Sequence, residues 1–188
     1  MRKTRKTLVV MAASAALAVT LTACGSDDGN SSESSGSKST SEDHNAEDVS
    51  FAQGMIPHHK GALEMAEEAT DKASSAEVKS LAARIEKAQA PEIETMTGWL
   101  KTWGEDVPTS TESMPGMEAM PEMNHGSAAE DFDKAFLAMM IEHHKGAVKM
   151  ATTEKAKGSY GPATAMADDV IRTQNAEITE MNKLLAKS

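Results

Sequence analysis

Phe51-Ala-Gln-Gly-Met55-Ile-Pro-His58-His59-Lys-Gly-Ala-Leu-Glu-Met65-Ala66 is the stretch that decides the fold, and the chain carries it twice. The second copy is Phe136-Leu-Ala-Met-Met140-Ile-Glu-His143-His144-Lys-Gly-Ala-Val-Lys-Met150-Ala151, and 10 of the 16 positions are identical. An α-helix advances 100° per residue, so the shared Phe, Met, His and Ala residues fall on one stripe about 120° wide. Such a stripe predicts a helix that faces the interior of a bundle.

A second repeated pattern follows each copy. Gln89-x-x-Glu92-Ile-x-x-Met96 recurs as Gln174-x-x-Glu177-Ile-x-x-Met181, with the same offset that separates Phe51 from Phe136. The repeat therefore covers a whole helical hairpin. Two such hairpins, each too thin to bury its own apolar stripe, are expected to pack as an all-α four-helix bundle.

The apolar periodicity and the turn residues place the four helices. We expect helices over about 48–69, 76–103, 127–155 and 163–186, with Asp48 or Ser50 capping the first. The bundle then spans 46–188, with repeats over 46–103 and 131–188. The crossover, 104–127, is long enough to set the third helix either parallel or antiparallel to the second, and the pattern does not decide between them.

The segment 1–23 resembles a secretory signal, with four basic residues, an apolar run and then Leu-Thr-Ala-Cys24. That ending resembles the lipobox of bacterial lipoproteins, so we expect residues 1–23 to be removed and Cys24 to carry a lipid. Residues 24–45 are rich in Ser, Gly and Asp and are expected to be a flexible tether. The protein would then be extracytoplasmic, anchored to the outer face of the cell membrane.

The net charge of the chain limits the classes of molecule that it is expected to bind. The net charge is −10, and loss of the four basic residues of the leader leaves 15 positive against 29 negative charges, a net of −14. Such a chain repels phosphate backbones, so nucleic acid is not an expected partner. Cys24 is the single cysteine, which excludes an internal disulfide and leaves no other thiolate as a metal ligand.

The paired histidines carry the main functional hypothesis. Four imidazoles buried without partners would cost about 1–3 kcal/mol each. Their partners must be water, the Gln and Glu residues of the second pattern, or a metal ion. Imidazole and thioether together are donors that Cu(I) prefers. The stripe therefore predicts Cu(I) or Ag(I) binding, at one site shared by the two repeats or at one site in each, by the following residues: Met55, His58, His59, Met65, Met140, His143, His144 and Met150. Met96 and Met181 are weaker candidates, and imidazoles with an ordinary pKa near 6.5 would lose metal below that pH.

The crossover carries a separate run of thioethers. Methionines recur at intervals of three and end at a histidine: Met114, Met117, Met120, Met123 and His125. Ordinary linkers need no thioethers, which are liable to oxidation outside the cell. We expect this loop to wrap a soft monovalent ion.

Two other classes of function remain open. Methionine on a helix is usually core filler, as expected for Met139 and Met166, and the whole bundle could be a structural or partner-binding module. A di-iron enzyme would need Glu-x-x-His on two helices, and the chain has this pattern only in the crossover, at Glu122 and His125. Catalysis is therefore not expected.

The doubled Met-Ile-x-His-His-x-x-Ala-x-x-Met-Ala motif, with the Gln-x-x-Glu-Ile-x-x-Met pattern, resembles the bacterial family catalogued as domain of unknown function 305, over about residues 46–186. The resemblance implies a ferritin-like bundle, extracytoplasmic placement and, in some members, copper binding. By position it implies the same eight stripe residues as ligands. We therefore expect a copper buffer or metallochaperone that exchanges metal with a donor or acceptor protein.

Overall fold

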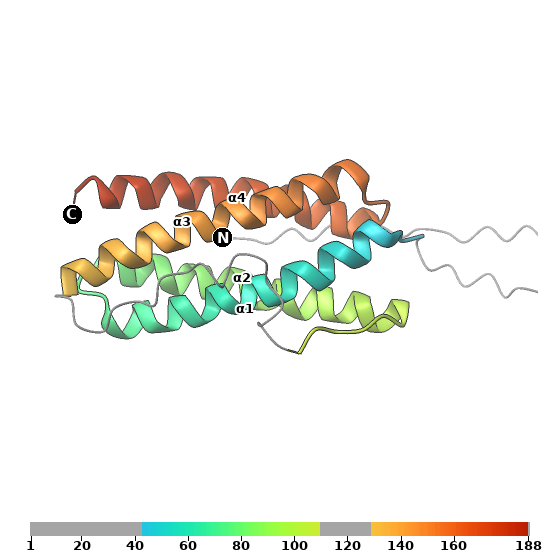
Figure 1. Cartoon of the computed structure of the whole chain (residues 1–188), viewed down its shortest axis with the longest axis horizontal. Helices are drawn as coiled ribbons and strands as arrows, with labels where there is room; N and C mark the ends of the chain where they lie inside the picture. Colours follow the sequence, from blue (N-terminus) through green and yellow to red (C-terminus); the bar gives the residue numbers. More distant parts are fainter. Residues whose placement is uncertain (1–42, 110–128, 188) are drawn as a thin grey trace, which may run out of the picture. The chain divides into compact units, whose positions relative to one another are not determined.

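The computed structural model describes residues 43–109 and 129–187, and all regular structure within these ranges is helical. The helices are α1 (Ala46–Lys72), α2 (Ala76–Trp103), α3 (Ala129–Lys157) and α4 (Gly161–Leu185). Figure 1 shows the four helices lying side by side. The predicted four-helix architecture is confirmed. Within the described part of the chain, no helix is both long and apolar enough to cross a membrane.

The two hairpins, α1–α2 and α3–α4, meet mainly through α1 and α3. These two helices are antiparallel, since Asn45 before α1 donates to the Lys157 carbonyl at the end of α3 over 2.9 Å. At the other end, Ser74 after α1 bonds Asp133 near the start of α3. Because α1 is antiparallel to both, α2 and α3 are parallel. This settles the orientation that the sequence left open.

The helix ends follow ordinary capping rules, at positions that differ slightly from those expected. Asn45 caps α1, because its side chain accepts from the backbone N–H groups of Glu47 and Asp48. Asp48 completes a capping box by accepting from the Asn45 N–H, so the expectation that Asp48 or Ser50 is the cap was wrong. Gly104 ends α2 with a φ of 78°, a left-handed conformation that glycine adopts without strain.

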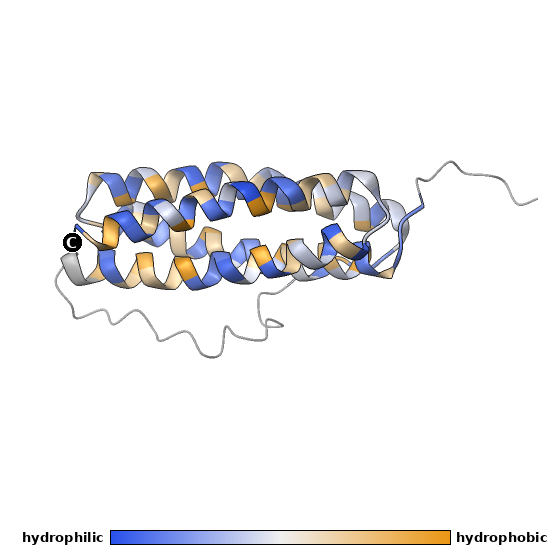
Figure 2. Ribbon diagram, turned by 90° about the horizontal axis from the view of Figure 1, so that it is seen from above, coloured by the Kyte–Doolittle hydropathy of each residue, from blue (hydrophilic) through white to orange (hydrophobic). Residues whose placement is uncertain are grey.

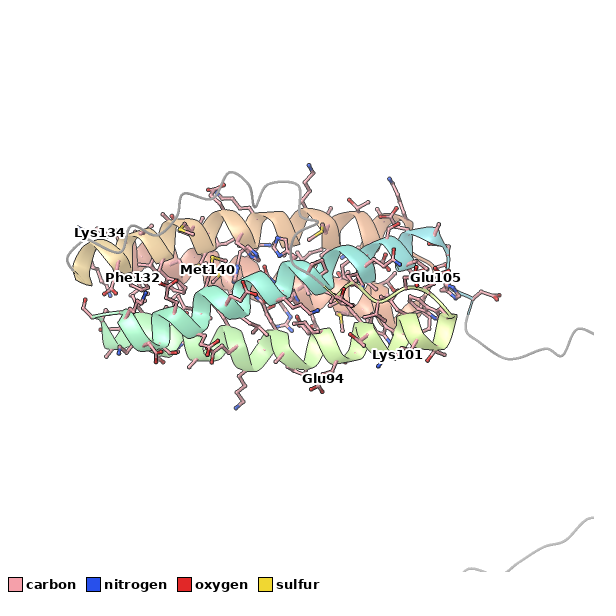
Figure 3. The ribbon with its side chains drawn as sticks, turned by 60° about the horizontal axis from the view of Figure 1, so that its bottom comes forward. Glu94, Lys101, Glu105, Phe132, Lys134 and Met140 are labelled. Carbon is pink, nitrogen blue, oxygen red and sulfur yellow. The ribbon has the colours of Figure 1, made fainter. Side chains whose placement is uncertain are left out.

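Each helix buries one face, and Figure 2 shows hydrophobic and hydrophilic residues alternating along all four. The buried apolar residues form two clusters, one toward each end of the bundle. On α2 the polar residues Glu94 and Lys101 lie on the outer side (Figure 3). Between the two apolar clusters the core is polar, and the repeated histidines lie there.

Candidate metal centre

His58 of α1 and His143 of α3 meet at the centre of the bundle. Their ring centroids are 3.7 Å apart, with the ring planes tilted by 47°. The two side chains are 5% and 6% exposed, so both rings are almost completely desolvated. The two residues occupy equivalent positions in the repeat. Their contact therefore lies on the approximate two-fold axis that relates the hairpins.

A glycine makes this close approach possible. A Cβ placed on Gly146 of α3 would lie 2.9 Å from Nε2 of His58, closer than real Cβ contacts come. Any larger residue at this position would push the imidazole away from α3. The glycine of the His-His-Lys-Gly motif is thus part of the site, a role that the helical pattern alone did not indicate. Its presence at the same place in both copies was the available signal.

The second histidine of each pair is held by a glutamate of its own hairpin. Nε2 of His59 lies 2.7 Å from Oε2 of Glu92, and Nε2 of His144 lies 2.7 Å from Oε2 of Glu177. Both imidazoles are completely buried. A carboxylate accepts only, so the neutral imidazole donates from Nε2 and its Nδ1 keeps a free lone pair. The glutamates were among the partners expected from the repeat, and the structure brings them to the histidines.

We call His58, His59, His143 and His144 the histidine belt. Five of its ring nitrogens are buried and make no hydrogen bond in the described part of the chain: Nδ1 of all four residues and Nε2 of His143. Gln89 and Gln174 are equivalent in the repeat and are also buried. Their side-chain oxygens likewise make no hydrogen bond in the described part of the chain. Buried polar atoms normally have partners, so this concentration of open donor atoms points to a ligand.

Burial keeps His58 and His143 uncharged. Desolvation lowers the pKa of His58 to about 3, with the neighbouring imidazoles of His59 and His144 acting in the same direction. Desolvation likewise lowers the pKa of His143 to about 2, and the neighbouring imidazoles of His58, His144 and His59 act in the same direction. The expected ordinary pKa near 6.5 is therefore wrong for these two residues. Neutral imidazole is the form that binds metal, and here it persists at mildly acidic pH.

The stripe methionines are divided between the two apolar clusters that flank the belt. Met55 is fully buried in one cluster, and the partly buried Met150 packs against it. Met140, whose side chain lies on the inner side of α3 in Figure 3, is fully buried in the other cluster, together with Met65. Each cluster thus takes one stripe methionine from each repeat. The structure does not gather all eight predicted ligands at one point.

Some of the predicted site residues lie outside the part of the chain that the structure describes. Cys24 and the crossover ligands (Met114, Met117, Met120, Met123 and His125) lie outside the described residues, as do the leader and most of the tether. Within residues 43–109 and 129–187, no three His, Cys, Asp or Glu side chains are placed to hold a metal ion together.

Two buried aspartates, which the sequence pattern did not mark as functional, join the repeats. Asp48, fully buried at the start of α1, accepts from the backbone N–H groups of Ser159 and Tyr160 in the α3–α4 turn. Asp133, its equivalent in the second repeat, accepts from the N–H groups of Ser74 and Ser75 in the α1–α2 turn. Each repeat therefore binds the turn of the other. The matched spacing of the two Asp and two Ser residues was the signal that could have found this.

The fold and the belt define a class of protein: a duplicated helical hairpin with buried imidazoles on its internal two-fold axis. The sequence profile of the domain of unknown function DUF305 matches residues 48–185, and the chain belongs to this family. No curated protein is significantly similar to the chain.

Solved structures extend the comparison. CopM in its Cu(II)-bound form is 37% identical, with 74% of this chain and 96% of that chain covered and a TM-score of 0.67. CopM in its Cu(I)-bound form is 34% identical, with 74% and 96% covered and a TM-score of 0.63. The putative secreted DUF305 protein from Streptomyces coelicolor is 32% identical, with 75% and 91% covered and a TM-score of 0.66.

Proposed function

We propose that the protein binds Cu(I) in preference to other ions, and can also take Ag(I), inside its helical bundle, and that it acts as a copper buffer or metallochaperone outside the cytoplasm. The observation that carries this proposal is the set of five buried imidazole nitrogens without hydrogen bonds. Left open, buried polar atoms cost about 1–3 kcal/mol each, a large fraction of the net stability of a domain. Ligation of a metal ion would offset that cost.

The donor chemistry favours a soft ion. A zinc site takes three or four imidazole, thiolate or carboxylate ligands, and no such group of three is assembled among the described residues. An ion at the belt would complete its coordination with thioethers, because Met55 precedes His58, and Met140 precedes His143, by three residues on the same helix face. Imidazole with thioether is a donor set suited to Cu(I).

The glutamates give the belt a defined orientation. Because Glu92 accepts from Nε2 of His59 and Glu177 accepts from Nε2 of His144, each imidazole is fixed with Nδ1 as its free donor. Carboxylate-supported imidazoles of this kind are typical of metal centres, and the arrangement is present in both hairpins.

The comparisons support the same ion. CopM, the structural relative at 34–37% identity, has been solved with Cu(I), Cu(II) and Ag bound. The Streptomyces relative is described as a putative secreted protein, which supports the proposed location outside the cytoplasm. As part of the proposal, Cys24 anchors the protein to the membrane, and the methionine run of the crossover captures the ion before the bundle holds it.

The test is an anaerobic titration of the protein with Ag(I) or Cu(I) against a competing chelator, with metal counted per chain. Replacing His58 and His143 together by Gln should weaken binding at the bundle by at least tenfold, and replacing all four belt histidines should leave only the weaker crossover site. His44→Gln is the matched control, because His44 stacks on Trp103 with ring centroids 4.4 Å apart and lies outside the belt. Unchanged affinity in both belt variants, with helical content intact by circular dichroism, would remove the belt from metal binding.

A further inference from the structure

Two carboxyl groups are in contact at the end of the bundle where α1 begins and α3 ends. Asp48 of α1 and Glu154 of α3 are both completely buried, and their side chains are hydrogen-bonded to each other. A Cβ on Gly158, just after α3, would overlap Oε1 of Glu154 and lie 2.8 Å from Oδ1 of Asp48. Both carboxyl groups therefore pack against this glycine. We call Asp48 and Glu154 the acid pair.

The contact within the acid pair requires a proton. Asp48 already accepts from three backbone N–H groups, those of Asn45, Ser159 and Tyr160, and is therefore the ionised member. Neither oxygen of Glu154 receives a hydrogen bond from a donor in the described part of the chain. A carboxylate can only accept, so the two groups form a hydrogen bond only when Glu154 is protonated and donates to Asp48. Burial, and next the carboxylate of Asp48, raises the pKa of Glu154 to about 8, so the proton is held at neutral pH.

A second negative charge on the acid pair would have no counter-ion. The charged side chains on the adjoining segments are Asp43 before α1, Glu47 on α1, Lys155 and Lys157 on α3, and Asp168 and Asp169 on α4. Lys155 pairs with Asp168, and no Lys, Arg or His within residues 43–109 and 129–187 makes an ion pair with either member of the acid pair. Two adjacent buried carboxylates repel each other, so loss of the proton breaks the contact.

The other repeat shows that the fold does not need the second carboxyl. Asp133, the equivalent of Asp48, binds the α1–α2 turn in the same way. The residue equivalent to Glu154 is Ala69, which is completely buried, and the residue equivalent to Gly158 is Ala73. An alanine at 158 would overlap the glutamate, so the glutamate and the glycine belong together. Only one end of the bundle therefore carries a group that can titrate in this contact.

The acid pair holds a group of aromatic side chains in place. Asp48 accepts from the N–H of Tyr160, whose ring makes edge-to-face contacts with Trp99 and Trp103 at centroid distances of 5.5 and 5.2 Å. His44, which precedes α1, stacks on Trp103. The start of α1, the end of α2 and the α3–α4 turn thus meet around these rings. Movement of Asp48 away from the turn would separate Tyr160 from both tryptophans.

We propose that the acid pair is a pH-sensitive latch, closed while the two carboxyl groups share one proton and open once that proton has passed to the solvent. Opening separates the start of α1 from the α3–α4 turn. The opposite end of the bundle stays closed, because Asp133 and Ala69 hold no proton there. The latch does not depend on metal binding.

Tryptophan emission of the full mature chain, measured with a chelator present from about pH 6 to about pH 9, tests this proposal. Trp99 and Trp103 are the two tryptophans of the chain, so the emission reports on this end of the bundle. We expect the emission to shift to longer wavelength in one step with a midpoint near pH 8, while circular dichroism shows that the helices remain. An emission that does not change over this range would overturn the proposal.

Variants separate the latch from general unfolding. Glu154→Gln can still donate to Asp48 but cannot ionise, and Glu154→Ala with Gly158→Ala reproduces the alanine pair of the other repeat. Both variants should abolish the step. Glu47→Gln is the matched control, because it leaves the acid pair intact. Its step should remain and move to lower pH, since a neighbouring negative charge is removed. If the step persists unchanged in Glu154→Gln, or if added Ca²⁺ lowers its midpoint at constant ionic strength, a shared proton does not hold the latch closed.

Discussion

Asp133 of α3 binds Ser74 of the α1–α2 turn through both the backbone N–H, at 2.9 Å, and the hydroxyl, at 2.7 Å. The carboxylate is 4% exposed and also accepts from the N–H of Ser75. Because these bonds cross from one repeat to the other, they fix how far α3 slides along α1. That register decides which imidazoles and thioethers meet at the belt.

Asp133→Ala should lower the free energy of unfolding by about 2 kcal/mol, since two part-buried N–H groups and a hydroxyl lose their acceptor. Urea unfolding followed by circular dichroism measures this. Asp168→Ala is the control, because Asp168 pairs with Lys155 at the exposed surface, where ion pairs contribute about 0–1 kcal/mol. Equal effects of the two variants would show that Asp133 does not hold the repeats together.

Gly146→Ala should destabilise the protein by about 1–3 kcal/mol, because its Cβ would displace the His58 ring and overpack the centre of the bundle. Gly98→Ala on α2 is the matched control. A Cβ there meets no atom within 4 Å, so alanine should stabilise the helix by about 0.5–1 kcal/mol. Thermal unfolding of both variants is the measurement. A stabilising Gly146→Ala would contradict the close approach of His58 to α3.

The metal-free protein should lose stability as the pH falls below 6.5. His58 and His143 have a folded-state pKa of about 3 and about 2, so the unfolded chain binds more protons at these sites. Their contribution to the free energy of unfolding is fully present above the unfolded-state pKa near 6.5. As the pH drops below that value the contribution decreases, with a slope that approaches about 1.4 kcal/mol per pH unit for each imidazole. Denaturant unfolding at pH 7, 6 and 5, with a chelator present, measures the slope. The His58→Gln, His143→Gln variant should show a shallower slope, and an identical slope would contradict neutral burial.

Ionisation of Glu154 should lower the stability of the protein as the pH rises, whereas ionisation of the two histidines lowers it as the pH falls. Burial raises the pKa of this carboxyl to about 8, and the nearby carboxylates of Asp48 and Glu47 add to the shift. The folded state then holds a proton that the unfolded chain releases near pH 4.5, so stability is lost as the pH rises toward 8. Glu154→Gln should therefore gain stability relative to the native protein between pH 5 and pH 9, as measured by denaturant unfolding across that range. A constant difference would show that Glu154 is ionised in the fold.

Much of the fold was predictable because helical periodicity is local. The stripe that contains Met55 and His58 predicted the inward face of α1, and the matched stripe with Met140 and His143 did the same for α3. The hydrogen bonds from His59 to Glu92 and from His144 to Glu177 could also be anticipated, because a short turn leaves the two helices of a hairpin little freedom to shift. The roles of Asp133 and Gly146 were missed because they depend on the opposite repeat.

The sequence by itself determined the four helices, the duplication and the donor atoms on each inward face, because all of these follow from a 3.6-residue period acting along one segment. Only the tertiary structure decided that α1 and α3 run antiparallel, that His58 meets His143, and that the methionines divide into two groups. The physical reason is the long crossover, which leaves the direction of the second hairpin free. Contacts between the two repeats, above all those of Asp48 and Asp133, select the direction of the second hairpin. The same packing desolvates His58 and His143 and lowers their pKa.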